Sequence, residues 1–156
     1  MSPSIAVDLK KRKHSGDQDT VTIRGEVTRV FKAWDQALLP HEAVHFVVEE
    51  VFGLVGFVRL TAAGVSSEQM IEEKDPEAMA AEALTNAFQY ELFGMAESGN
   101  DALRQSLAQM FTHATGAQPR VSDAQLDDGR QRLSELVAAW AGVGPGEHLV
   151  LDLSAR

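Results

Sequence analysis

The chain has 156 residues, a formal net charge of −9 and 44% hydrophobic residues, which indicates one globular domain, 1–156, with a sizeable core. The acidic balance argues against nucleic acid as the main partner, and no apolar run is long enough to span a membrane. Cysteine is absent, which excludes disulfides and cysteine metal sites and fits a cytoplasmic protein. No apolar segment follows the first basic residues, so we expect no secretory signal.

The pattern over residues 4–32 predicts extended structure. Polar and apolar side chains alternate within 4–9, 20–24 and 26–31, and turn-forming residues separate the first two stretches. We therefore expect two or three antiparallel strands, with residues 1–3 and the 10–19 loop flexible. The four basic residues at 10–13 could bind phosphate or act as a targeting signal, but a solvated strand end and hairpin loop is the favoured interpretation.

The segment 38–53 predicts a helix that begins near Pro40 and ends at Gly53. At 100° per residue, its valines and alanine fill most of the helix circumference, which indicates a well-buried helix. The polar side chains share one arc of about 100°: His41, Glu42, His45 and Glu49. A polar arc at this spacing is also typical of a solvated helix face, and that interpretation stays open.

The string His41-Glu42-Ala-Val-His45 places two imidazoles one helical turn apart, close enough to share a zinc ion. It resembles the signature of the zincin metallopeptidases. That resemblance implies His41 and His45 as zinc ligands and Glu42 as the general base. Pro40 places His41 in the first turn, which departs from the zincins. Glu49 lies about 12 Å along the helix from His41, so we expect a third ligand from elsewhere in the fold.

Beyond this helix the chain continues in helical segments. Residues 54–64 are apolar and punctuated by glycine, and we expect a second helix there. The acidic segment 66–75 is interpreted as a connection. Asp75 and Pro76 are a favourable helix start, and the helix they open should run to Phe93.

This later helix carries Glu82 and Asn86, which share one face at i, i+4. They resemble the pair that the gluzincin branch supplies from a downstream helix, where a glutamate binds the metal and an aspartate four residues later braces the first histidine. The resemblance implies Glu82 as the third ligand and Asn86 as the residue that braces the first histidine. We also expect Glu49 to lie behind the ligands. The alternative, in which Glu82 and Asn86 form the outer face of an alanine-rich helix, is favoured by the pattern alone.

The rest of the chain predicts two helices and a strand. A helix over 101–115 contains His113 near its end, where the helix dipole favours a basic side chain. A Ser-x-x-Gln capping box opens a helix over 123–141. Residues 147–153 then form a strand that we expect to join the N-terminal ones, with His148 at its rim.

These elements predict an α+β fold, with a small antiparallel sheet from the N-terminal strands and the C-terminal strand packed on four to five helices. The arrangement also resembles an uncharacterised family of small bacterial proteins, which share short strands, a Pro-His-(Asp or Glu)-x-x-His helix that continues into Val-Glu, a glycine-rich apolar segment and a closing strand. The matching residues are 40–45, 48–49, 53–64 and 146–153. This second resemblance implies no activity.

Two classes of function follow. The first is a zinc-binding, zincin-like protein that acts as a zinc-dependent hydrolase or peptidase, with His41, His45 and Glu82 as ligands and Glu42 as general base. The second is a non-catalytic structural or protein-interaction domain in which His41, His45 and Glu49 form a polar patch. In either case we expect a substrate or protein partner and neither nucleic acid nor a membrane, and homo-oligomerisation stays open.

Overall fold

The computed structural model describes residues 4–33, 38–112 and 120–154. The predictions for residues 1–3 and for His113 lie outside these ranges. Within them, no helix combines the length and the apolar character needed to cross a membrane.

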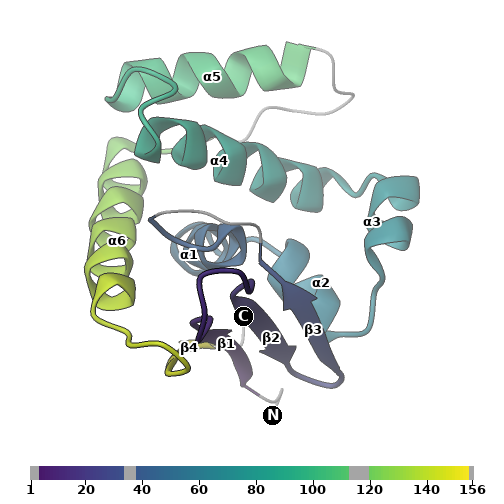
Figure 1. The fold of residues 1–156 in the computed structure, drawn as a ribbon. Helices are drawn as coiled ribbons and strands as arrows, with labels where there is room; N and C mark the ends of the chain where they lie inside the picture. Colours follow the sequence, from purple (N-terminus) through teal and green to yellow (C-terminus); the bar gives the residue numbers. More distant parts are fainter. Residues whose placement is uncertain (1–3, 34–37, 113–119, 155–156) are drawn as a thin grey trace.

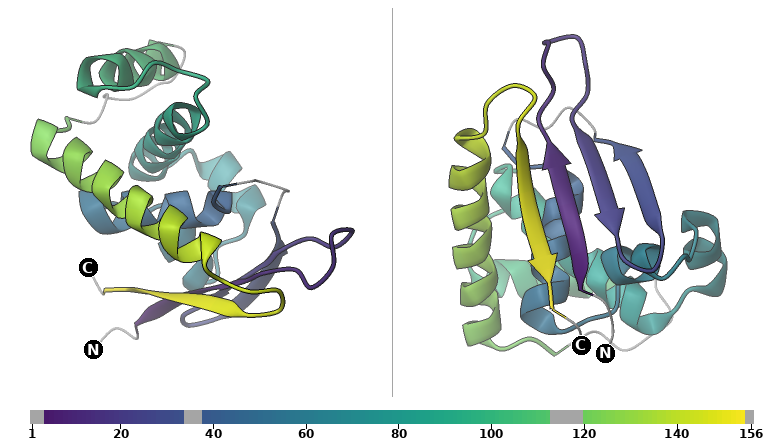
Figure 2. Two further views of the ribbon diagram at one scale, coloured as in Figure 1. Left: turned by 60° about the vertical axis from the view of Figure 1, so that its left-hand side comes forward. Right: turned by 90° about the horizontal axis from the view of Figure 1, so that it is seen from below.

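The sheet is built from both ends of the chain, as predicted. Four antiparallel strands lie in the order β3-β2-β1-β4, so that the last strand of the sequence pairs with the first (Figure 2). Val7, on β1, lies opposite Ile23 on one side and Leu151 on the other, and all three side chains are buried. The strands are β1 (Ile5–Lys10), β2 (Thr20–Arg24), β3 (Thr28–Lys32) and β4 (His148–Leu153).

The helices cover one face of this sheet. α1 and α2 lie nearest to it, α4 and then α5 are stacked beyond them, and α6 runs along one side (Figure 1). The α+β fold is therefore as predicted, although the described residues contain six helices and not four or five. They are α1 (His41–Phe52), α2 (Phe57–Ala62), α3 (Ser67–Glu73), α4 (Pro76–Leu92), α5 (Asn100–Thr112) and α6 (Asp123–Ala141).

The additional helix is α3, and here the prediction of a connection over 66–75 was wrong. Ser66 forms a capping box: its hydroxyl accepts a hydrogen bond from the Gln69 backbone N–H at 3.2 Å, and the Gln69 side chain accepts one from the Ser66 backbone N–H at 3.0 Å. This local signal starts a helix even though none of the residues of α3 is buried.

The centre of the helical layer is α1, which contacts α2, α4 and α6. Its apolar side chains, such as Val44, Phe46 and Val48, are fully buried. Pro40 is the N-cap and not the first helical residue, and Gly53 ends the helix in the left-handed conformation at φ 66°. Because α1 is enclosed, the side chains of Glu42, His45 and Glu49 are also buried, and the solvated-face interpretation does not hold. His41 is partly exposed.

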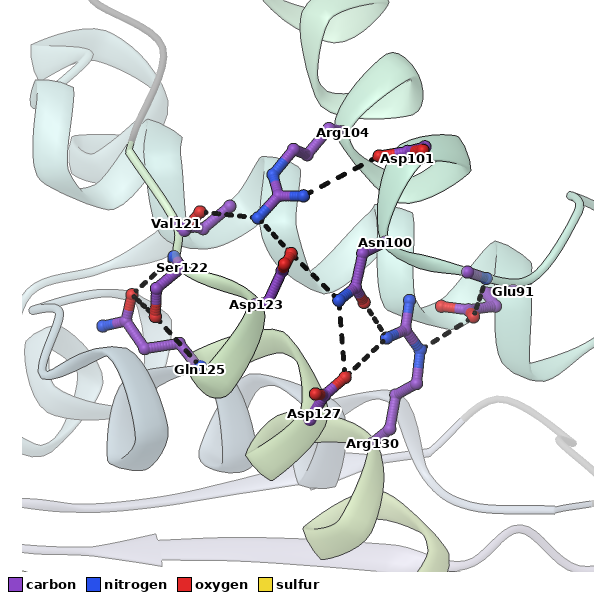
Figure 3. A network of polar contacts seen from close by, with 11 residues as sticks. Glu91, Asn100, Asp101, Arg104, Val121, Ser122, Asp123, Gln125, Asp127 and Arg130 are labelled. Carbon is purple, nitrogen blue, oxygen red and sulfur yellow. Dashed lines mark hydrogen bonds and ion pairs between the residues drawn. The ribbon is translucent and has the colours of Figure 1, made fainter.

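A polar network joins the three outer helices (Figure 3). Arg130 on α6 bonds to Glu91 on α4 at 2.9 Å and to Asn100 at the start of α5. Arg104 on α5 pairs in turn with Asp123 on α6 at 2.6 Å. These contacts hold α5, which packs on α4 at the far side from the sheet, in one orientation.

The outer face of the sheet carries a second polar cluster. Asp8 is only 8% exposed, and its carboxylate lies 2.6 Å from His148 Nδ1 and 3.1 Å from Arg24. Burial opposes ionisation of Asp8, but the hydrogen bonds from His148 and Arg24 outweigh it and hold the pKa of this carboxyl below its ordinary value. His148 is thus part of a sheet-surface cluster on β1, β2 and β4.

The basic segment at 10–13 has a structural contact. Lys11 donates a hydrogen bond to the Trp140 carbonyl at 2.6 Å, and its ammonium group lies 4.6 Å from the centre of the Trp140 ring. The contact attaches the loop after β1 to the end of α6. His14 is exposed, as predicted.

Candidate metal centre

The first turns of α1 present His41 and His45 on the same side of the helix. Their rings meet edge to face with centroids 4.7 Å apart, and their Nε2 atoms are 3.1 Å apart. His45 is 3% exposed and is flanked by the Phe57 ring, whose centroid lies 5.2 Å from its own. The i, i+4 spacing therefore brings two ring nitrogens to a common point.

The third group comes from α4. Glu82 places Oε2 3.0 Å from His45 Nε2, and the three potential ligand atoms of His41, His45 and Glu82 all lie within 4.8 Å of one another. In a tetrahedral zinc site with bonds of about 2.0–2.1 Å, neighbouring ligand atoms are about 3.3 Å apart. The structure thus brings together the three residues predicted as ligands, and His45 Nε2 lies about this distance from both His41 Nε2 and Glu82 Oε2.

Two further residues of α4 orient the imidazoles. His41 Nδ1 is hydrogen-bonded to the side-chain oxygen of Gln89. Thr85 Oγ1 donates to the Ala81 carbonyl at 2.8 Å and therefore receives the Nδ1–H of His45, at 3.3 Å. With both Nδ1 atoms carrying hydrogen, each Nε2 has a lone pair directed at the shared point.

With the imidazoles neutral in this tautomer, three acceptor atoms converge: two Nε2 lone pairs and a carboxylate oxygen. When His45 is protonated, its Nε2–H donates to Glu82 instead. A proton on His45 Nε2 would pair with Glu82 but would leave His41 Nε2 unsatisfied. A divalent cation would bind all three at once. The donor set, two imidazoles and one carboxylate, is the set found in catalytic zinc sites that keep one position open.

The ionisation of the cluster also fits ligands. Burial lowers the pKa of His41, and the neighbouring His45 lowers it further, so the imidazole stays neutral as a ligand must be. The contact with His45 lowers the pKa of Glu82, with smaller contributions from His41 and a hydrogen bond from Asn86. Asn86 therefore forms a hydrogen bond with Glu82. The position behind His41, which was predicted for Asn86, is occupied by Gln89.

Sequence reasoning missed Thr85 and Gln89. Together with Glu82 they follow an i, i+3, i+7 spacing, which places all three on one face of α4. Thr85 and Gln89 could therefore have been predicted from their spacing relative to Glu82.

Glu49 makes its hydrogen bonds to the backbone that follows α1. Its carboxylate is fully buried and accepts backbone hydrogen bonds from Gly56 at 3.1 Å, Val58 at 2.8 Å and Arg59 at 2.9 Å. Burial raises the pKa of Glu49, and the three N–H donors oppose that rise. The side chain closes the N-terminus of α2, whose first residue, Phe57, packs on His45. Glu49 therefore supports the cluster through α2.

Glu42 lies beside the cluster, 9% exposed, and its Oε2 atom is buried without a hydrogen-bond partner among the described residues. It borders a pocket of about 730 Å³ that is also lined by His41, His45 and Glu82. A buried carboxylate oxygen that lacks a partner is unfavourable unless a ligand or solvent molecule supplies one. The pocket places Glu42 and the two histidines along one wall.

Comparison with known proteins identifies no counterpart: no family model, no curated protein and no solved structure matches this chain.

Proposed function

We propose that this protein binds zinc through His41, His45 and Glu82 and is a zinc-dependent hydrolase. The observation that carries the proposal is the convergence of three acceptor atoms whose histidine rings are already fixed from behind by Gln89 and Thr85. Histidine ligands in zinc sites typically donate their other ring N–H in this way, which fixes the tautomer and the ring orientation.

A zinc ion at this point would supply Lewis-acid polarisation and lower the pKa of a water molecule. The chain's own contribution is Glu42, which lines the same pocket and whose carboxylate can accept a proton. His41 and His45 hold their positions through α4, so the geometry is set before any ligand arrives. The reaction class supported by these groups is hydrolysis of an ester or amide.

The test is zinc titration of protein produced without a histidine tag and treated with a chelator. We expect one zinc ion per chain in the wild type and loss of stoichiometric binding in the variant that combines His41→Ala with His45→Ala. Glu82→Gln, which removes the carboxylate charge while keeping the side-chain size, should weaken binding. The matched control is His14→Ala, because His14 is an exposed histidine outside the cluster.

The second candidate is the non-catalytic domain, and one observation favours it. Both Nδ1 atoms of the histidines contact α4, so the cluster can order α1 against α4 without a metal ion. In that case His41→Ala and His45→Ala would lower the melting temperature equally with and without zinc. Zinc-dependent stabilisation of the wild type that is absent from the double variant would instead support the metal site.

A further inference from the structure

The pocket beside the candidate metal centre has an unusual wall. Its polar part consists of the cluster residues of α1 and α4, together with Ser67 and Lys74 at α3. The remaining wall is largely apolar and comes from four helices, α2 to α5, through Phe57, Met70, Ile71, Met79 and Met110. Its volume of about 730 Å³ lies within the range of about 300–1,000 Å³ that is typical of small-molecule sites.

Methionine is concentrated at this wall. Three of the chain's five methionines line the pocket, at positions 70, 79 and 110, whereas the buried hydrophobic core of the described residues contains none. The methionine side chain is unbranched and polarisable, which suits it to apolar ligands of variable shape more than to a uniquely packed core. This distribution indicates a surface that adapts to an apolar occupant.

The helix α3 supplies a second, independent observation. None of its residues is buried, yet Met70 and Ile71 contribute to the pocket wall, and Ile71 is 73% exposed. An apolar side chain on a short exposed helix gains nothing from folding while it stays in water. The same side chains would be covered by an apolar ligand in the pocket.

We propose that the ligand of this site is a linear amphiphile: a polar acyl head at the His41–His45–Glu82 cluster and an extended alkyl chain against the methionine wall. The inference rests on the proposed function and specifies its substrate as a fatty-acyl ester or amide of medium chain length. In the reaction, water adds its hydroxyl to the acyl carbon and the bond from that carbon to the ester oxygen or amide nitrogen breaks. The leaving oxygen or nitrogen takes the remaining proton.

The experiment measures binding, so it requires no knowledge of the natural substrate. Zinc-loaded protein is titrated by calorimetry with straight-chain alkyl hydroxamic acids, from acetohydroxamate to the twelve-carbon member. Every member has the same metal-binding head, and only the apolar chain grows. Each added methylene should tighten Kd about threefold to fourfold until the wall is covered, after which Kd should level off.

A pair of methionine variants tests where the alkyl chain of the ligand binds. Met70→Gln places a polar group in the wall and should flatten the chain-length dependence, with the Kd of acetohydroxamate unchanged. Met95→Gln is the matched control, because Met95 is 72% exposed and does not line the pocket. Since α3 buries none of its residues, Met70→Gln should fold normally, and circular dichroism checks this.

The outcomes separate the two proposals. A protein that binds no zinc in the titration above overturns both. Zinc and acetohydroxamate binding with a Kd independent of chain length overturns the amphiphile inference and leaves the zinc site standing. A chain-length dependence that is equal in wild type and Met70→Gln places the chain elsewhere and overturns the assignment to this pocket.

Discussion

The carboxylate of Glu49 offers the sharpest test of how the candidate centre is supported. Three backbone N–H groups at the start of α2 point at it, and the whole group is buried. In Glu49→Gln, the amide keeps one oxygen that can accept, but its NH₂ group must face a backbone N–H that previously had an acceptor. The substitution changes no volume, so any loss of stability comes from charge and hydrogen bonding.

The magnitude follows from the number of bonds affected. One charge-assisted hydrogen bond is lost outright, which corresponds to about 1.5–3 kcal/mol, and two are weakened. Removing a buried charge relieves part of its desolvation penalty, which acts in the opposite direction. We therefore expect a net loss of about 2 kcal/mol of unfolding free energy. With a urea m-value of about 2 kcal/mol/M, the unfolding midpoint should fall by about 1 M.

The assay is urea unfolding at pH 8, followed by far-UV circular dichroism. The control is Glu50→Gln, the neighbouring glutamate, which is about one-third exposed and pairs with Arg132 at 3.0 Å. That pair lies near the surface, so its removal should cost at most about 1 kcal/mol. Equal midpoints for Glu49→Gln and wild type would refute the capping argument. Zinc stoichiometry should be unchanged, because Glu49 holds α2 and not the ion.

Three other predictions concern single side chains. Asp8→Asn should cost about 1 kcal/mol at neutral pH. Because the folded pKa of Asp8 lies below its ordinary value of 3.8, this contribution is present above pH 3.8 and is lost as the pH falls through the folded value. Urea midpoints over an acid series would show the difference closing, and a constant difference would contradict it. Gly56→Ala places a Cβ 2.7 Å from the Ala81 Cβ and should cost about 1–3 kcal/mol, measured by thermal unfolding. A raised melting temperature would contradict this clash. Glu42→Gln should retain zinc and the fold while hydrolysis of ester or peptide substrates falls about 10²–10⁴-fold. Undiminished turnover would exclude Glu42 as the base.

The sequence was most informative where the deciding interactions are local. The 41–52 helix and the 123–141 helix were predicted from caps and periodicity, and both boundaries are set by neighbouring residues, such as Gly53 and the Ser122 capping box. The error at α3 has the same origin, because Ser66 and Gln69 carried an equally local signal that was outweighed by the acidic composition. The capping box at Ser66 and Gln69 was therefore sufficient to predict this helix.

The interactions around the candidate centre were harder to predict because their partners are distant in sequence. Glu49 bonds to backbone N–H groups, which leave no mark in the sequence beyond the small residue Gly56. The pairing of His148 with Asp8 depends on the register between the first and last strands, and only their adjacency could be expected. Glu82 was predicted only because Glu82 and Asn86 resemble a metal-ligand pair. That resemblance does not predict the contact between Gln89 and His41.

The energetics of the α1–α4 interface bear on whether the polar cluster has a role beyond holding the fold. Two histidines and a threonine lie where packed apolar side chains would cover the same area without needing partners, and such replacements are often neutral or stabilising. On the side of α1 that packs on α6, the core residue Phe46 is fully buried, and the ion pair between Glu50 and Arg132 lies near the surface. If α1 served stability alone, we would expect the side facing α4 to be as apolar as the buried part of the side facing α6. The polar side is also the one that borders the pocket and the unpartnered oxygen of Glu42. Local departures from an optimal core are expected at functional sites, so this asymmetry argues that the cluster serves ligand chemistry.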